Sequence, residues 1–174
     1  MGFISTILNN IRNMKKAKKI REMGKENLLA LEDEDFYEAM CCLCDDEVYD
    51  IKASGLTKEQ ILAYSIYMFE MEVNNGGLCQ FFVNSSSECA PFVSEALGAI
   101  GATELKDLFE QFVKDNGIDV TDLSSFKITD VEEYEVQTER FDFDKFDNSF
   151  YDNENFHQQA INYFRCNIEQ LLKD

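Results

Sequence analysis

The chain has 174 residues, 45 % of them hydrophobic and 13 % aromatic, which is enough apolar material for the core of one domain. It carries 34 Asp and Glu against 16 Lys and Arg, so we expect it to repel nucleic acid and anionic lipid and to attract cationic partners. No apolar run has the roughly 18 residues that a membrane span needs, and no signal-peptide pattern is visible. We therefore expect a cytoplasmic protein with reduced cysteines.

The charge is distributed unevenly along the chain. Residues 1–25 hold seven basic side chains and one acidic side chain, whereas residues 26–174 hold nine basic and 33 acidic side chains. This contrast predicts two parts, a basic amphipathic helical extension over residues 1–25 and an acidic all-helical domain over residues 26–174.

The first predicted element is an amphipathic helix, because apolar residues recur at helical spacing and basic residues follow them. The apolar positions are Phe3, Ile4, Ile7, Leu8, Ile11 and Met14. Residues 1–21 are suited either to lie on an anionic membrane or to pack on the chain's own acidic domain or on a second subunit. The second interpretation is favoured because the opposite charge is so near.

Two further helices are predicted in the first half of the chain. One begins near Glu34 and ends near Gly55. The next opens with Thr57 and Gln60, which have the spacing of a capping box, and continues through an almost wholly apolar stretch. We expect this second helix to be buried at the centre of the fold and to end at residues 74–77, where two asparagines precede two glycines.

After this break, the pattern predicts a short helix around Gln80 and longer helices over residues 91–101, 103–117 and 156–172. Residues 118–139 lose the helical period and are predicted to form a loop or a brief extended piece. The predicted fold class is therefore all-α, a single-domain helical bundle with an N-terminal amphipathic helical extension.

No arrangement of residues in the sequence points to catalysis or to metal binding. The chain has one histidine, His157, on the closing helix, and a lone histidine beside an apolar stripe is more often structural than catalytic. Cys41, Cys42 and Cys44 are clustered, but no second Cys pair completes a metal site. We predict no catalytic residue, no metal and no cofactor.

The acidity is concentrated in residues 115–155, which hold 13 Asp and Glu against three Lys and Arg. Such a run is either a solvated face or an interaction surface that takes the place of DNA in a basic cleft. Interspersed aromatic residues are expected to pin this segment to the core. The candidate partner-binding carboxylates are those of Asp130, Glu132, Glu133, Glu135, Glu139, Asp142 and Asp144.

Two motifs stand out in the second half of the chain and its centre. The first is E-x-x-N-G-G-x-x-Q-F-F-x-N, formed here by Glu72, Asn75, Gly76, Gly77, Gln80, Phe81, Phe82 and Asn84. The second is F-x-x-x-D-x-x-F-Y, formed by Phe143, Asp147, Phe150 and Tyr151. Both resemble the motifs of a bacterial family of DNA-mimic proteins long described only as a domain of unknown function. The resemblance extends over roughly residues 30–172. The first motif is expected to be structural, with its amide side chains bonding backbone groups at the helix break.

The resemblance implies an all-helical, dimeric protein that binds a helix-turn-helix transcription regulator and keeps it off its operator. Our leading hypothesis is a non-enzymatic acidic binding protein, a DNA mimic that sequesters a basic DNA-binding protein without binding nucleic acid itself. Two alternatives remain open: an immunity-type inhibitor of a basic nuclease toxin, and a peripheral membrane protein anchored by the basic N-terminal helix. A homodimer is possible in each case.

Overall fold

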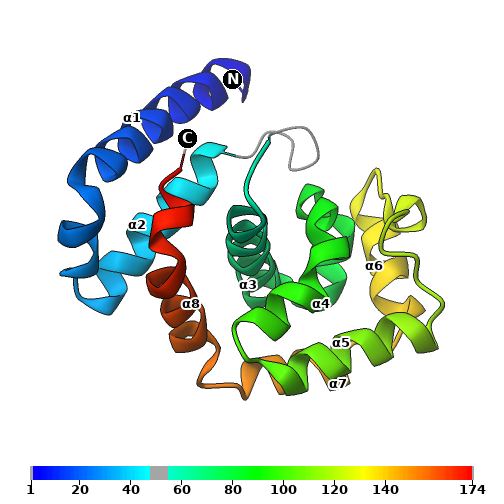
Figure 1. Cartoon of the computed structure of the whole chain (residues 1–174). Helices are drawn as coiled ribbons and strands as arrows, with labels where there is room; N and C mark the ends of the chain where they lie inside the picture. Colours follow the sequence, from blue (N-terminus) through cyan, green and yellow to red (C-terminus); the bar gives the residue numbers. More distant parts are fainter. Residues whose placement is uncertain (1, 48–54, 174) are drawn as a thin grey trace. The chain divides into compact units, whose positions relative to one another are not determined.

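The computed structural model describes residues 2–47 and 55–173. Over these residues the fold is all-α, as predicted, with eight α-helices, two short 3-10 helices and no strand (Figure 1). The helices belong to two compact units, one formed by residues 1–64 and 161–174 and the other by residues 65–160. The chain passes between the units within α3 (Lys58–Val83) and again within α8 (Phe156–Leu171).

The first unit contains α1 (Gly2–Leu29) and α2 (Asp33–Glu47), together with the first turns of α3 and the last turns of α8. Helices α1 and α2 are in contact, and Ala17, Ile20 and Leu28 of α1 are buried. The N-terminal helix thus packs on a neighbouring helix of its own chain. Membrane contact by residues 1–21 stays the less favoured alternative, and the division of the chain at residue 25 stays a prediction.

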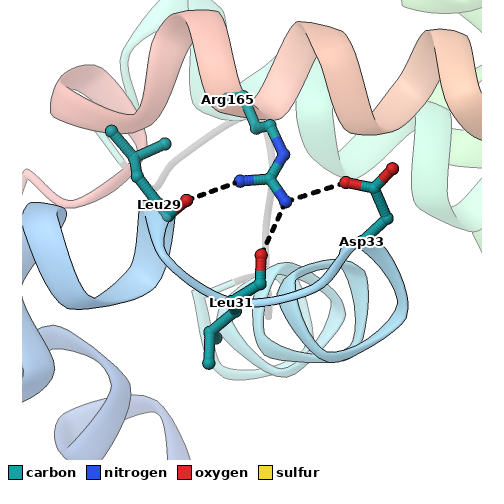
Figure 2. Close-up of polar contacts among 4 residues, drawn as sticks. All are labelled: Leu29, Leu31, Asp33 and Arg165. Atoms are coloured by element: carbon teal, nitrogen blue, oxygen red, sulfur yellow. Dashed lines mark hydrogen bonds and ion pairs between the residues drawn. The ribbon is translucent and has the colours of Figure 1, made fainter.

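The corner between α1 and α2 is held by Arg165 of α8 (Figure 2). Its Nη1 donates to the carbonyl oxygen of Leu29 at 3.0 Å, and its Nη2 donates to the carbonyl oxygen of Leu31 at 2.9 Å and to Asp33 Oδ1 at 2.8 Å. The guanidinium carbon also lies 4.3 Å from the ring centroid of Phe36. The planar, multiply donating guanidinium group satisfies the carbonyl of Leu29 at the end of α1 and that of Leu31 in the turn that follows.

The start of α3 confirms the predicted capping box. Gln60 Oε1 accepts a hydrogen bond from the backbone N–H of Thr57 at 2.8 Å, and Thr57 Oγ1 accepts one from the N–H of Gln60 at 3.2 Å. The predicted end of the preceding helix, near residues 53–55, lies mostly outside the described residues. The buried side chains along α3, Leu62, Ala63, Tyr64, Ile66, Phe69 and Val73, confirm that it is a core helix.

The second unit contains the remainder of α3, then η1 (Ser85–Cys89), α4 (Ala90–Ala99), α5 (Thr103–Asp115), η2 (Ser124–Phe126), α6 (Val131–Arg140), α7 (Asp144–Tyr151) and the start of α8. The predicted helix starts at Pro91 and Thr103 are confirmed. In the view of Figure 1, α7 overlaps α5, and the two helices are in contact.

A cluster of phenylalanines forms the core of this unit. The ring of Phe69 lies 5.0 Å from Phe81, 5.9 Å from Phe109, 5.8 Å from Phe146 and 6.0 Å from Phe150, all in edge-to-face arrangements. These rings come from α3, α5 and α7. The aromatic residues interspersed in the acidic segment therefore anchor α7 to the core, as predicted.

The prediction for residues 118–139 was wrong in its second half, because Val131–Arg140 form helix α6, shown in yellow in Figure 1. Asp130 is its N-cap, and Asp130 Oδ1 accepts from the N–H of Glu133 at 2.9 Å. The helical period is faint in the sequence because only Gln137 is buried and Tyr134 is half-buried along the whole helix. With a face this narrow, few apolar positions are left to mark it.

Candidate partner-binding surface

The geometry of the second unit begins with a break inside α3. Gly76 and Gly77 depart from helical backbone angles, and Gly77 has a φ of 75°, which side chains disfavour. The predicted helix end at residues 74–77 is therefore confirmed as a break between two helical segments of α3.

Across this break, the buried carboxyl group of Glu72 binds Gln80 and Asn84 of the first motif, together with Ser86. Its Oε2 accepts from Gln80 Nε2 and from Asn84 Nδ2, both at 2.8 Å, and its Oε1 accepts from Ser86 Oγ at 2.8 Å. The expectation that Gln80 and Asn84 bond backbone groups was wrong, because a buried carboxyl group is the stronger acceptor. Asn75 is exposed.

The second motif satisfies the backbone at the same break. Asp147 Oδ1 accepts from the N–H of Leu78 at 2.8 Å, and the hydroxyl of Tyr151 donates to the carbonyl oxygen of Val73 at 2.8 Å. Helix α7 thus supplies an acceptor for the segment after the break and a donor for the segment before it. Burial raises the pKa of Asp147, although the Leu78 hydrogen bond opposes this shift.

The candidate surface itself is built on α6, which is tied down at its N-terminus and along its inner face. Glu133 Oε2 accepts from the N–H of Thr129 at 2.6 Å and from its Oγ1 at 3.0 Å. Gln137 Nε2 and Arg140 Nη1 both donate to the carbonyl oxygen of Ser125, at 2.8 and 3.0 Å. These contacts fix α6 against η2.

Arg140 adds a second anchor at the C-terminal end of α6. Its guanidinium carbon lies 5.4 Å from the ring centroid of Phe126 and 4.8 Å from that of Phe141. Phe126 is buried, and its ring centroid lies 4.9 Å from that of Phe82 in α3. The basic residue of this acidic helix is therefore engaged on the inner side of the helix.

The outer face of α6 is acidic and exposed. Glu132, Glu135 and Glu139 are spaced three and four residues apart, so they form one row on the helix surface, and all three are exposed. Val131 and Val136 flank this row and are 71 % and 65 % exposed. We call these five residues the outer face of α6.

All seven predicted carboxylates are exposed, but they fall into two groups. Five belong to α6 and its N-cap. Of the other two, Asp144 is the first residue of α7 and Asp142 precedes this helix, where it lines a groove of about 190 Å³ together with Asp115, Asn116 and Lys145. The structure therefore brings residues 130–139 together on one helix and places Asp142 at the edge of α5.

Two further fixed carboxylates precede α6 and were missed in the sequence. Asp119 Oδ1 accepts from the N–H of Thr121 at 2.9 Å and from its Oγ1 at 2.7 Å, and Asp122 Oδ1 accepts from the N–H of Ser124 at 3.1 Å. Hydrogen bonds from Thr121 and Ser124 lower the pKa of Asp119 and of Asp122, respectively. The signal was the D-x-T and D-x-S spacing, which is typical of side-chain turns.

The cysteines and the histidine of the second unit do not form a reactive group in the described structure. Burial raises the pKa of Cys79 to about 11 and that of Cys89 to about 12, so both thiols are protonated at neutral pH. His157 Nδ1 lies 3.3 Å from Glu70 Oε1. Among the described residues, no three His, Cys, Asp or Glu are grouped so as to hold a metal ion. No helix in the part of the chain that the structure describes could cross a membrane.

Fold and surface together define a class, an all-helical acidic protein that presents fixed carboxylates on a tethered helix. Residues 54–167 match the family described as DMP19-like protein, and this match covers more than half of the chain. The chain belongs to the DMP19-like protein family, a family of non-enzymatic DNA-mimic proteins. No curated protein and no solved structure matches the chain. The predicted resemblance is thus confirmed, over a shorter range that leaves out α1 and α2.

Proposed function

We propose that this protein is a non-enzymatic DNA mimic that sequesters a basic DNA-binding protein, such as a helix-turn-helix transcription regulator. The observation that carries the proposal is the exposed row of glutamates on α6, held in place by contacts on the other side of the helix. This row belongs to a unit, residues 65–160, that holds 20 Asp and Glu against five Lys and Arg, a net charge of −15.

The charge spacing on α6 is of the right order for this role. Duplex DNA presents one negative charge per roughly 1.7 Å of its axis. At a rise of about 1.5 Å per residue, the four glutamates between residues 132 and 139 present one charge per roughly 3 Å. Because the helix is fixed before binding, little conformational entropy is lost when a partner docks.

The proposed contact set is the seven carboxylates predicted from the sequence, with Asp119 and Asp122 added. An interface made of such groups gives fast, salt-sensitive association with a basic partner. The protein would compete with DNA for the partner and would not bind nucleic acid itself.

The test compares the full chain with the triple variant E132Q/E135Q/E139Q, which keeps side-chain size and removes three charges. Each is immobilised and exposed at low salt to a lysate of the source cells, and retained proteins are released by a salt gradient and identified. We expect the wild type to retain a DNA-binding protein that duplex DNA displaces and that the variant retains weakly. Retention of no such protein, or equal retention by both chains, would contradict the proposal.

The same experiment separates the regulator from the nuclease alternative. A retained protein that binds an operator duplex, and is released from it by the wild-type chain in a mobility-shift assay, supports the transcription regulator. A retained nuclease whose cleavage of DNA is blocked by the wild-type chain supports an immunity-type inhibitor instead.

A further inference from the structure

The outer face of α6 holds two apolar side chains that a purely electrostatic surface does not need. Val131 and Val136 are the two most exposed large hydrophobic residues among the side chains of residues 16–44 and 55–173. Valine is also a weaker helix former than alanine, so helix formation does not account for either residue. Two exposed valines on a ten-residue helix rich in glutamate give its outer face an apolar component beside its charge.

The valines and glutamates of this face are interleaved. Val131 and Glu135 are four residues apart, and so are Glu132 and Val136, which makes each valine the surface neighbour of a carboxylate one turn away. Lysine and arginine have the complementary form, an aliphatic stem that covers apolar surface and a charged head that stays in a polar environment.

We infer that the outer face of α6 is a mixed docking site for a helix of the basic partner that carries lysine or arginine side chains. In this site Val131 and Val136 contact the aliphatic stems, and Glu132, Glu135 and Glu139 bind the charged heads. The inference rests on the proposed function and adds that part of the affinity is apolar and does not depend on salt.

Charge decides between a basic partner and a second copy of the chain on this face. A second copy docked through the same face would bring the glutamate row of one α6 against that of the other, and like charges in direct apposition are strongly unfavourable. A basic helix meets the same row with opposite charge and covers the valines at the same time.

The test uses a defined probe, a synthetic helical peptide with lysines along one face, titrated against the full chain by isothermal calorimetry. Titrations run from about 50 to 300 mM NaCl, because screening weakens only the ionic part. The key variant is V131T/V136T, which keeps shape and β-branching and replaces a methyl group with a hydroxyl group. The charge variant is E132Q/E135Q/E139Q, and Met71→Gln is the control, since Met71 is an exposed apolar residue on α3.

We expect V131T/V136T to bind the peptide about tenfold more weakly at every salt concentration, with the same salt dependence as wild type. The charge variant should bind more weakly at low salt and show a flatter salt dependence, and Met71→Gln should bind like the wild type. If V131T/V136T binds like the wild type while the charge variant is weakened, the mixed site is wrong and the DNA-mimic proposal stands. If the charge variant binds as tightly as wild type, both are wrong.

Sedimentation velocity tests whether the valines serve self-association instead. If the wild type is a dimer, V131T/V136T is a monomer and the two bind the peptide equally, the valines serve self-association and the inference is overturned. An unchanged oligomeric state, combined with the loss of peptide affinity, supports it.

Discussion

The second unit uses the same side-chain chemistry in two opposite ways. At the break in α3, the carboxyl group of Glu72 is buried and that of Asp147 is half-buried. They accept hydrogen bonds from the side chains of Gln80, Asn84 and Ser86 and from the N–H of Leu78. On α6, the carboxylates of Glu132, Glu135 and Glu139 are exposed and leave their oxygens to water. Acidity alone therefore does not identify a binding residue in this chain.

The physical difference lies in what remains when each kind of carboxyl group is removed by substitution. A buried carboxyl group that accepts several hydrogen bonds leaves unsatisfied donors when it is removed, and each of these costs free energy. An exposed carboxylate leaves only solvated neighbours, and its removal costs little stability while it changes the surface potential. The comparison thus predicts a division between residues that matter for stability and residues that matter for binding.

The largest expected effect is that of Glu72→Ala. Removing the acceptor shared by Gln80, Asn84 and Ser86 should lower the free energy of unfolding by about 3–5 kcal/mol, measured by urea denaturation. Glu72→Gln is the matched control, because its oxygen can still accept from both amides and its NH₂ can donate to the Ser86 hydroxyl. We expect the control to lose about 1 kcal/mol. Equal losses for the two variants would mean that packing, and not hydrogen bonding, accounts for this site.

The next effect compares two glycines that share a φ of 75°, Gly77 in α3 and Gly24 in α1. A Cβ atom at Gly77 would lie 2.3 Å from Asp147 Oδ2, whereas a Cβ atom at Gly24 meets nothing within 4 Å. Gly77→Ala should therefore lose about 3 kcal/mol of unfolding free energy, and Gly24→Ala about 1 kcal/mol from backbone strain alone. Similar losses at both positions would show that Asp147 does not constrain the break.

A smaller, pH-dependent effect is expected for Asp147→Asn. The asparagine Oδ1 can still accept from the N–H of Leu78, so this hydrogen bond is retained while the ionisable group is lost. Burial raises the pKa of Asp147 in the folded chain, and the unfolded chain keeps the ordinary value of about 4. Between these two values the folded state binds more protons, so this group adds stability as the pH falls and loses it as the pH rises.

The unfolding free energy of the wild type relative to Asp147→Asn should therefore increase as the pH is lowered from neutral toward about 4. Parallel denaturation curves of both chains over this range measure the difference, in which the other carboxyl groups cancel. A difference that stays constant with pH, or that decreases toward acid, would contradict the raised pKa.

The smallest effect on stability is expected for E132Q/E135Q/E139Q. Because these side chains are exposed, the unfolding free energy should change by no more than about 0.5 kcal/mol. At low salt the change should favour the variant, since it removes charge from a unit with an excess of acid. A loss of several kcal/mol on urea denaturation would place these glutamates in the fold and remove the contrast with Glu72.

Local features of the chain could be predicted because their causes lie within a few residues of one another. The capping box of Thr57 and Gln60, the glycine break at residues 74–77 and the helix starts at Pro91 and Thr103 each depend on neighbouring residues. The acidic character of the second half and the motifs of the DNA-mimic family are also properties of sequence alone. The partner-binding role of the seven carboxylates stays a proposal.

Tertiary structure decided which polar residues meet and which helices form without a strong pattern. Leu78 and Asp147 are 69 positions apart, and Val73 and Tyr151 are 78 positions apart, yet these pairs satisfy the backbone at one break. Helix α6 depends on contacts of Gln137 and Arg140 with Ser125 more than on an apolar stripe. A periodic pattern in the sequence reflects which residues of one helix are buried, whereas a hydrogen bond between distant segments produces no such pattern. The same residue type, glutamate, is therefore a buried hydrogen-bond acceptor at position 72 and an exposed surface residue at position 132.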